Sequence, residues 1–311
     1  MVVGDLCVAW SWEHDADFVR LLDAACRSLG TSLIQVTPYN LDDTLRSLAM
    51  DQLSFRAFYD RASDADERFL SLVQWSRDRA LYRINPYERA KRTWDKADMH
   101  VALVDAGLPV PYTIILPCYR DHPVLPPIDL SLLGNRLTIK PAHGGGGEGV
   151  VVEAASLNQV IAARQQYPND RYLLQAHVVP IRLESRPAWF RVLYCAGQAY
   201  PCWWDTSSHI YTPVTTVEEA EYALTTLRQM TASIAHVCDL ELFSTEIALT
   251  SSGFFVAIDY INDPTDLRLR SRAMDGVPDE IVRDIAGRLA ALVATHCLAA
   301  RGPVGFCFDT D

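Results

Sequence analysis

Apolar residues in the first 90 positions alternate between short runs and helical spacing. Residues 6–10 and 32–36 are short apolar runs, which are typical of β-strands. Between them, apolar residues recur at helical spacing from Phe18 to Leu29, and Gly30 follows as a natural C-cap. A further helical pattern leads to a short run near Leu81. This alternation predicts βαβ units and therefore a partly parallel sheet in a domain covering residues 1–90.

The pattern changes after Asn85-Pro86. Residues 90–106 are expected to form one helix, with Trp94, Ala97, Val101 and Val104 on a common face and Gly107 at its end. Strands are then predicted near residues 107–116, 136–140, 171–175, 188–194, 198–204, 242–249 and 253–260, with helices at about 155–166, 217–237 and 278–299. The last four strands form two predicted antiparallel pairs, so we expect an α+β arrangement here.

Composition and charge exclude several classes of partner. The net charge is −11, from 28 basic and 39 acidic side chains, which argues against nucleic acid and anionic membrane. The first residues do not resemble a signal peptide, and no apolar run approaches the roughly 20 residues of a membrane span. We therefore expect a cytoplasmic protein. The eight cysteines, Cys307 among them, lie scattered without a C-x-x-C pair, and we expect reduced, mostly buried thiols.

A glycine-rich loop is the most informative segment. Gly144 to Gly147 and Gly149 follow the predicted strand that ends at Lys140. Such a loop lets backbone amides approach phosphate oxygens, and a lysine just before it is a natural phosphate ligand. The segment does not match either of the common glycine-rich phosphate motifs, because it lies between strands and lacks the G-K-[ST] sequence. A flexible hairpin loop preceded by a solvated lysine is the alternative.

Two acidic residues occupy neighbouring strands of the last predicted hairpin. Glu246 and Asp259 lie within apolar runs, and Asn262 follows three residues later. A charge among apolar neighbours is costly unless it is paired or bound to metal. Carboxylate and amide oxygens suit Mg²⁺, which completes its shell with water and phosphate oxygens. The sequence therefore predicts a magnesium site, with two solvent-facing acids as the alternative.

The order of these features resembles the ATP-grasp superfamily and its glutathione synthetase-like ATP-binding fold. Lys91-Arg-Thr-Trp-Asp-Lys96 and Gly107-Leu-Pro-Val-Pro-Tyr-Thr113 are similar to the opening of these enzymes. The resemblance implies a Rossmann-like domain over residues 1–90, a small lobe with a glycine-rich flap over 91–180, and a large lobe with the metal site over 181–311. It also implies ATP and Mg²⁺ as cofactors.

The resemblance carries roles onto individual residues. By analogy, the nucleotide and metal ligands are Lys96 and Lys140 on the phosphates, Gly144, Gly145, Gly146 and Gly147 in the flap, Gln175, Ala176, His177 and Val178 at the adenine hinge, Glu184 on the ribose, and Glu246, Asp259 and Asn262 on Mg²⁺. Arg191 and Lys140 would face the transferred phosphate. The chain departs from the family at two places. Trp189 stands where an Asp is common, and Asp259 stands where a Glu is commoner. Asp259 and Asn262 are also one residue further apart than usual, so either a bulge realigns them or one of the two is not a ligand.

Three functions follow from this resemblance. The first is a carboxylate–amine ligase that forms an acyl phosphate with ATP and acts on a small-molecule or peptide substrate. The second is a kinase of the same fold for a polyol or inositol phosphate, whose anionic substrate would need arginines such as Arg182, Arg186, Arg191, Arg268, Arg270 and Arg272. The third is a nucleotide-binding protein without catalysis. The sequence does not determine the oligomeric state, and a homodimer is one possibility.

Overall fold

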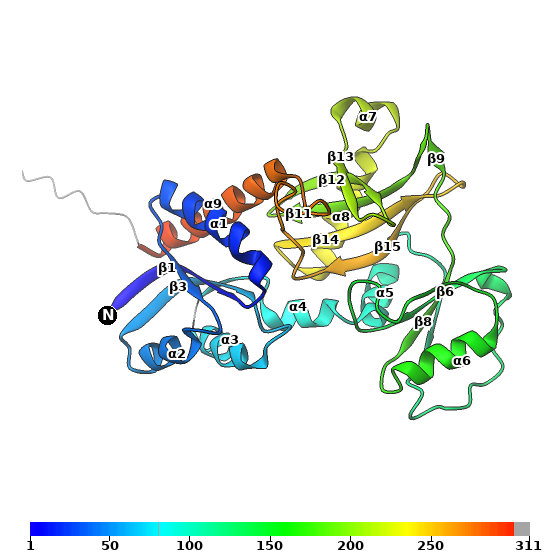
Figure 1. Cartoon of the computed structure of the whole chain (residues 1–311), viewed down its shortest axis with the longest axis horizontal. Coiled ribbons are helices and arrows are strands. Elements are labelled where there is room, and N and C mark those ends of the chain that lie inside the picture. The colour runs from blue at the N-terminus through cyan, green and yellow to red at the C-terminus, as the bar shows by residue number, and fades with distance from the viewer. Residues whose placement is uncertain (80, 302–311) are drawn as a thin grey trace, which may run out of the picture. The chain divides into compact units, whose positions relative to one another are not determined.

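The computed structural model describes residues 1–79 and 81–301, which leaves Cys307 outside the described part. The chain divides into two compact units (Figure 1). The N-terminal unit comprises Met1–Tyr87 together with the chain from Asp266 onward, and the central unit comprises Glu88–Thr265. We expected residues 181–311 to form one lobe, and this boundary is wrong for the last segment. Its final helix packs on the first helix and first strand of the N-terminal unit.

The N-terminal unit contains a four-stranded sheet in the order β2-β1-β3-β4, with all its pairs parallel. Its elements are β1 (Val2–Trp10), η1 (Glu13–Asp15), α1 (Ala16–Ser28), β2 (Leu33–Val36), α2 (Leu41–Ala49), β3 (Leu53–Arg61), η2 (Glu67–Phe69), α3 (Leu70–Arg77), β4 (Tyr82–Ile84) and α9 (Asp279–Arg301). The predicted βαβ organisation is confirmed. The docking of α9 is fixed by a stacked contact between the rings of Tyr82 and His296, 3.6 Å apart, and by burial of its apolar side in this unit.

Strand β3 was not predicted, although it lies next to β1 in the sheet. Its sequence carries Arg56, Asp60 and Arg61 among the apolar residues, which hides the pattern of a buried strand. The structure satisfies the innermost charge, because the guanidinium of Arg61 forms two hydrogen bonds with the carboxylate of Asp15, at 2.7 and 3.0 Å. Both side chains are almost fully buried. A buried charge is tolerated when it is paired in this way.

The central unit contains two larger antiparallel sheets and one two-stranded antiparallel hairpin within residues 182–187 (Figure 1). The four-stranded sheet has the order β5-β8-β6-β7 and the five-stranded sheet the order β13-β12-β11-β14-β15. The elements are α4 (Tyr87–Thr93), α5 (Lys96–Asp105), β5 (Thr113–Leu116), η3 (Ser131–Leu133), β6 (Leu137–Pro141), β7 (Val151–Ala154), α6 (Leu157–Gln166), β8 (Tyr172–Ala176), β9 (Arg182–Leu183), β10 (Arg186–Pro187), β11 (Trp189–Cys195), β12 (Gln198–Asp205), β13 (Ile210–Pro213), α7 (Thr216–Glu221), α8 (Thr225–Cys238), β14 (Leu242–Leu249) and β15 (Phe255–Asn262). Both predicted antiparallel pairs are present.

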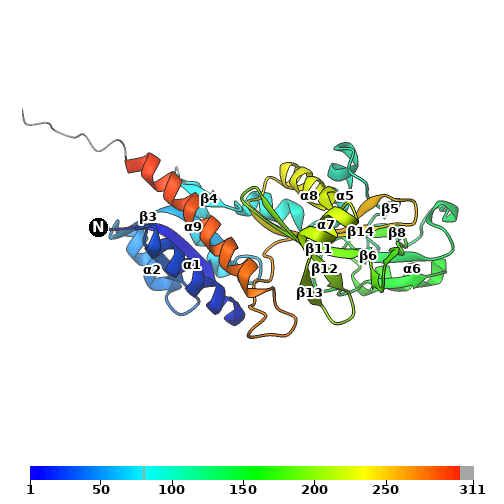
Figure 2. The same ribbon diagram turned by 90° about the horizontal axis from the view of Figure 1, so that it is seen from above.

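Helix α8 packs on β11 and β12 and also contacts α5 (Figure 2). Its buried residues, such as Leu227 and Ile234, belong to the same core cluster as Phe190 of β11. A separate apolar cluster lies between the four-stranded sheet and α6, with Val160 and Tyr172 fully buried in it. The five-stranded sheet is therefore covered on the face that α8 occupies, and its other face is left for polar side chains.

The single helix expected over residues 90–106 is wrong, because two helices occupy this stretch. The chain breaks after Thr93, and Asp95 begins α5 by accepting hydrogen bonds from the backbone N–H groups of Ala97 and Asp98, at 2.9 and 3.1 Å. An aspartate in this position offsets the unpaired amides at the start of a helix. The expected apolar face is also wrong, since Val101 and Val104 are exposed. The break places Lys96 at the first turn of α5.

The described part of the chain also shows the state of its cysteines and the apolar character of its helices. The cysteines in this part are not joined in disulfides, and all but Cys118 are buried. Among residues 1–79 and 81–301, no helix is both long and apolar enough to cross a bilayer.

Candidate functional site

Three charged side chains lie in one row across the five-stranded sheet. Arg191 of β11 pairs with Glu246 of β14, which pairs in turn with Asp259 of β15. Residues that pair directly on antiparallel strands point to the same face of the sheet. The Nη1 atom of Arg191 lies 3.3 Å from Oε1 of Glu246, and its Nε donates to Ser244 Oγ at 3.3 Å. Phe190, next to Arg191, points to the opposite face and into the core under α8. The charges therefore gather on the face away from α8.

Asn262 joins this face through a register shift in β15. Ser244 pairs with Asn262 and Glu246 with Asp259, so two steps along β14 correspond to three along β15. In a regular strand, residues three apart point to opposite faces. The extra residue cancels that alternation, and Nδ2 of Asn262 donates to Oδ2 of Asp259 at 3.1 Å. The unusual spacing in the sequence is therefore compatible with one shared site.

Lys140 reaches this row from the other sheet of the central unit. It lies on β6, it is 9% exposed, and its Nζ donates to the backbone carbonyl of Ile258 at 2.9 Å. Ile258 precedes Asp259 on β15, so the ammonium group lies beside the carboxylates. Burial lowers the pKa of Lys140 from its ordinary value, while the charges of Asp259 and Glu246 oppose that shift. The solvated-lysine alternative is wrong for this residue.

The carboxylates of Glu246 and Asp259 repel one another when both are charged. Burial raises the pKa of Glu246, the charge of Asp259 raises it further, and the guanidinium of Arg191 acts in the opposite direction. A bound cation would offset this repulsion. Among the residues that the structure describes, no three or more His, Cys, Asp or Glu side chains are grouped to hold a metal ion. A cation beside Glu246 and Asp259 would thus need further oxygen ligands from Asn262, water or phosphate, which is the habit of Mg²⁺.

Lys96 connects the start of α5 to the glycine-rich loop. Its backbone N–H donates to the carbonyl of Ala142 at 2.8 Å, and its Nζ donates to the carbonyl of Gly144. The loop residues Gly144 to Gly147 are exposed, and Gly144, Gly146 and Gly147 have positive φ angles of 111°, 61° and 78°. Residues with a Cβ rarely adopt such angles. The loop conformation therefore depends on glycine, and Lys96 lies against its first residue.

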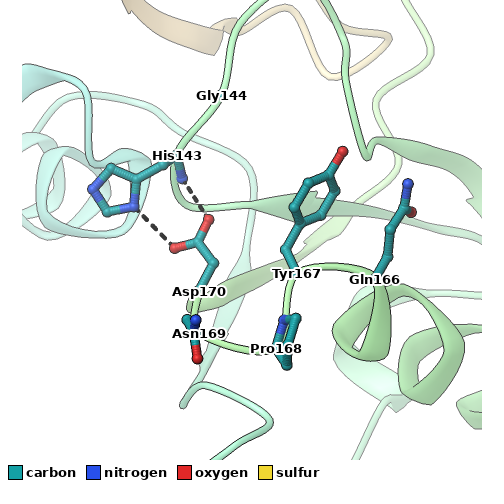
Figure 3. A pocket seen from close by; sticks show the side chains of 7 residues that line it. All are labelled: His143, Gly144, Gln166, Tyr167, Pro168, Asn169 and Asp170. Atoms are coloured by element: carbon teal, nitrogen blue, oxygen red, sulfur yellow. Dashed lines mark hydrogen bonds and ion pairs between the residues drawn. The ribbon is translucent and has the colours of Figure 1, made fainter.

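The base of this loop is held by a chain of ion pairs. His143 donates its backbone N–H to the carboxylate of Asp170 at 2.9 Å, and its Nδ1 lies 2.9 Å from the other oxygen of the same carboxylate (Figure 3). The Nε2 atom of His143 lies 3.6 Å from Asp95, which also binds the guanidinium of Arg171. The hydrogen bond with Asp170 raises the pKa of His143. Loop, β8 and α5 are thereby joined at one point.

A shallow hollow opens beside this junction. Its volume is about 470 Å³, and it is lined by His143, Gly144 and residues 166–170 at the end of α6 and just after it (Figure 3). The hydroxyl of Tyr167 donates to Glu148 at 2.8 Å, which ties the far side of the glycine loop to the end of α6. The hollow thus lies at the stem of the loop rather than beside the carboxylate row.

Gln175, expected at the adenine hinge, directs its side chain into a buried network. Its Nε2 donates to the hydroxyl of Tyr260 at 2.7 Å and lies 3.2 Å from Thr113 Oγ1. The Tyr260 hydroxyl lies 2.7 Å from Nδ1 of His100. Burial lowers the pKa of His100, which favours a neutral ring that accepts the hydroxyl proton. The side chain of Gln175 therefore belongs to the buried hydrogen-bond network that joins β8, β15 and α5.

The other hinge residues follow at the end of β8. The backbone N–H of Ala176 donates to the carbonyl of Tyr112 at 2.8 Å, and that of His177 reaches the carbonyl of Arg136 at 3.4 Å. Val178 comes after the strand and is half-buried. Backbone groups at the end of a strand can bind the edge of a planar ligand only where the hydrogen-bond ladder stops, which here is after the N–H of His177.

Glu184, expected on the ribose, lies in the exposed turn between β9 and β10, with a φ angle of 50°. Its carboxylate accepts a hydrogen bond from the hydroxyl of Tyr222 at 2.9 Å. The structure thus gives Glu184 a partner within the central unit and a position at the tip of a hairpin.

Comparison with known proteins bears on the fold. No protein-family model matches the chain, and no curated protein matches it in sequence. Solved structures do match over nearly the whole chain. D-alanine–D-alanine ligase from Bacillus anthracis, complexed with ATP, has a TM-score of 0.65 at 11% identity and covers 96% of this chain and 99% of its own. The macrocyclase MdnC from Microcystis aeruginosa, bound to its precursor peptide MdnA, has a TM-score of 0.64 at 10% identity, with 94% and 100% covered. The ATP-grasp ligase PsnB, complexed with a minimal precursor, Mg and ADP, has a TM-score of 0.62 at 14% identity, with 94% and 98% covered.

The chain has the ATP-grasp fold. Within this fold, the structure brings together Lys140, Arg191, Glu246, Asp259 and Asn262, which are the predicted metal ligands and the two residues expected to face the transferred phosphate. Lys96 and Gly144 form a second group at the glycine loop. These two groups are neighbours, because the backbone N–H of Lys96 donates to the carbonyl of Ala142, two residues after Lys140. Burial lowers the pKa of Lys140, and the positive charge of Lys96 acts in the same direction.

Several residues around the candidate site were not predicted from the sequence. Trp189 donates its indole N–H to Oε2 of Glu246 at 2.9 Å, although we noted it only as a departure from the family. Tyr260 and His100 were not singled out, and neither were Asp95 and Asp170. Tyr260 directly follows Asp259, and a tyrosine hydroxyl in an otherwise apolar strand is a signal that a buried partner exists. The two aspartates carry no comparable signal, because their partners lie far away in sequence.

Proposed function

We propose that this chain is an ATP-dependent carboxylate–amine ligase that works through an acyl phosphate. The observation that carries the proposal is the meeting of Lys140 with the row formed by Arg191, Glu246 and Asp259. Cations beside paired carboxylates are what a bound Mg²⁺–nucleotide triphosphate requires. Structural neighbours of similar fold include ligases solved with ATP or with Mg and ADP, which supports the same use of the fold here.

Mg²⁺ would be held by Glu246 and Asp259, with the amide oxygen of Asn262 as a third ligand. These residues fit the ion, because both carboxylates share one face of the sheet and repel one another without it. Bound there, Mg²⁺ would neutralise charge on the phosphate oxygens. Asn262 uses its Nδ2 group to bind Asp259, so the amide oxygen of Asn262 would be available to the ion.

The chain's own residues would then act on the substrates by position and charge. A substrate carboxylate oxygen attacks the γ-phosphorus of ATP, the bond to the β-phosphate oxygen breaks, and ADP leaves. An amine then attacks the acyl carbon, inorganic phosphate departs, and the amine proton passes to solvent or phosphate. Lys96, Lys140 and Arg191 would offset the charge that develops on the transferred group. The loop Gly144 to Gly147 would close over the phosphates and exclude water.

The adenine ring would lie against the end of β8. The resemblance implies recognition groups on the backbone of Ala176 to Val178, where the N–H groups of Ala176 and His177 would have to exchange their present carbonyl acceptors to serve. The side chain of Gln175 supports the strand through Tyr260. Glu184 is kept as the ribose ligand, which would require it to exchange Tyr222 for the ribose hydroxyls.

The pairing of the arginines favours a ligase over a polyol phosphate kinase. Arg186 is paired with Glu218, and Arg268 with both Asp266 and Asp275. A polyanionic substrate would need several unneutralised cations around it, and these arginines have acidic partners. A small-molecule or peptide carboxylate carries less negative charge and needs fewer cations around it.

Hydroxylamine trapping tests the proposal. The protein is incubated with ATP, Mg²⁺, hydroxylamine and a panel of amino acids and short peptides. A ligase yields a hydroxamate together with stoichiometric ADP and phosphate, and Glu246→Gln abolishes both products. Glu221→Gln, an exposed change of the same kind at the end of α7, is the matched control and retains them. A stable phosphorylated alcohol formed in the same panel would refute the ligase and establish the kinase.

A further inference from the structure

One carboxylate of the proposed metal site is held on both of its oxygens by the same strand. Trp189 and Arg191 are two residues apart on β11 and therefore point to the same face. The indole Nε1 of Trp189 donates to Oε2 of Glu246 at 2.9 Å, and Nη1 of Arg191 lies 3.3 Å from Oε1. Each oxygen of Glu246 thus has one donor from β11.

The strand register explains why a residue as large as tryptophan is needed. Arg191 lies directly opposite Glu246, whereas Trp189 lies opposite Ala248. Trp189 must therefore reach Glu246 along the diagonal, a separation of about 7–8 Å that aromatic and long side chains can bridge. The small side chain of Ala248 leaves room for the indole to turn this way. An aspartate or serine at position 189 would be too short to make the same contact.

The chemistry of the indole suits a supporting role. Tryptophan offers one N–H donor, has no acceptor and carries no charge. It can thus fix the plane of the Glu246 carboxylate without competing for the cation and without adding a second positive charge next to Arg191. A carboxylate has about four lone-pair sites. Two are taken by Trp189 and Arg191, so about one on each oxygen is left for a cation.

We infer that Trp189 is a positioning residue that orients Glu246 for the divalent cation. The inference rests on the proposed function, because it takes Glu246 and Asp259 as the cation ligands. Groups that orient metal ligands commonly change metal affinity by about 10–100-fold when they are removed. A tryptophan that served only to fill space would leave the affinity for the cation unchanged when another aromatic ring of suitable shape replaced it.

Direct binding of Mn²⁺ tests this inference without any assay of turnover. Free Mn²⁺ is counted by its electron paramagnetic resonance signal in the presence of a non-hydrolysable ATP analogue, for the wild type and for Trp189→Phe. We expect the dissociation constant for Mn²⁺ to rise about tenfold in the variant. Trp75→Phe is the matched control, because the indole N–H of Trp75 is buried without a hydrogen-bond partner. Loss of the Trp75 indole N–H should leave the dissociation constant for Mn²⁺ at the wild-type value.

A second variant keeps the shape and removes only the donor. Incorporation of β-(3-benzothienyl)alanine at position 189 replaces the indole N–H by sulfur, so packing is retained even where Trp189→Phe fails to fold. Weaker Mn²⁺ binding by this isostere supports the inference. Wild-type affinity in the isostere overturns it while the cation site stands. Absence of Mn²⁺ binding by the wild type itself, with the nucleotide analogue bound, overturns the cation site and the inference together.

Discussion

Removal of one hydroxyl group, in Tyr260→Phe, probes the network that joins the nucleotide strand to the metal strand. Tyr260 is 2% exposed, and its hydroxyl makes two hydrogen bonds of 2.7 Å, one with Gln175 and one with His100. The substitution keeps the ring and deletes both bonds. It leaves the Nε2 donor of Gln175 and the Nδ1 acceptor of His100 buried without this partner.

The cost follows from the two groups that lose their partner. A buried polar group left unsatisfied costs about 1–3 kcal/mol. Gln175 keeps a weaker contact with Thr113 at 3.2 Å, so its share lies at the low end, and His100 carries most of the remainder. We expect the free energy of unfolding of the central unit to fall by about 2–4 kcal/mol. This lies in the upper part of the range for single substitutions.

The measurement is urea unfolding followed by far-UV circular dichroism, with Tyr112→Phe as the control. Tyr112 is 50% exposed, so loss of its hydroxyl should change the free energy of unfolding by less than about 0.5 kcal/mol. The pH dependence adds a second check. The lowered pKa of His100 means that the unfolded state binds the proton more readily, so stability is lost as the pH falls below the ordinary histidine value. A Tyr260→Phe protein as stable as the control would refute the reasoning.

Three further outcomes are expected. Asp95→Ala removes the cap of α5 and should destabilise the central unit by about 1–2 kcal/mol in chemical unfolding; an unchanged unfolding midpoint would contradict this. His143 has a raised pKa through Asp170, so its contribution to stability is complete below the ordinary histidine value and is lost as the pH rises through the raised value; a stability difference between wild type and His143→Gln that grows with pH would have the wrong sign. Lys140→Met should lower kcat by about 10²–10³-fold with circular dichroism unchanged, and normal turnover would remove Lys140 from the site.

The regular elements show where prediction from sequence succeeds. The hairpin of β14 and β15 was predicted correctly, because its apolar runs are interrupted by a clear turn at residues 250–253. Strand β3 was missed because its charges are neutralised only by residues distant in sequence, such as Asp15 for Arg61. The break between α4 and α5 was missed because Trp94 and Asp95 are compatible with a helix until the capping bonds of Asp95 are considered.

The site shows the same division. Lys140, Glu246 and Asp259 could be proposed from the sequence, since a charge within an apolar strand is costly unless it has a partner or a task. Their partners could not be proposed, because the contact of Trp189 with Glu246 depends on a diagonal in the strand register. Gln175 was expected to face the nucleotide, and only the fold reveals that its side chain turns to Tyr260 instead.

The sequence alone therefore determined the alternation of elements, the glycine loop and the charged strand positions, because these depend on local periodicity and on the cost of burying charge. The tertiary structure decided which of those charges meet. The row of Arg191, Glu246 and Asp259 exists through pairing across three strands, and Asn262 joins it through a shift of one residue in β15. The placement of α9 in the N-terminal unit was also decided by packing. Such contacts join residues far apart in the chain, so they cannot be predicted from local sequence patterns.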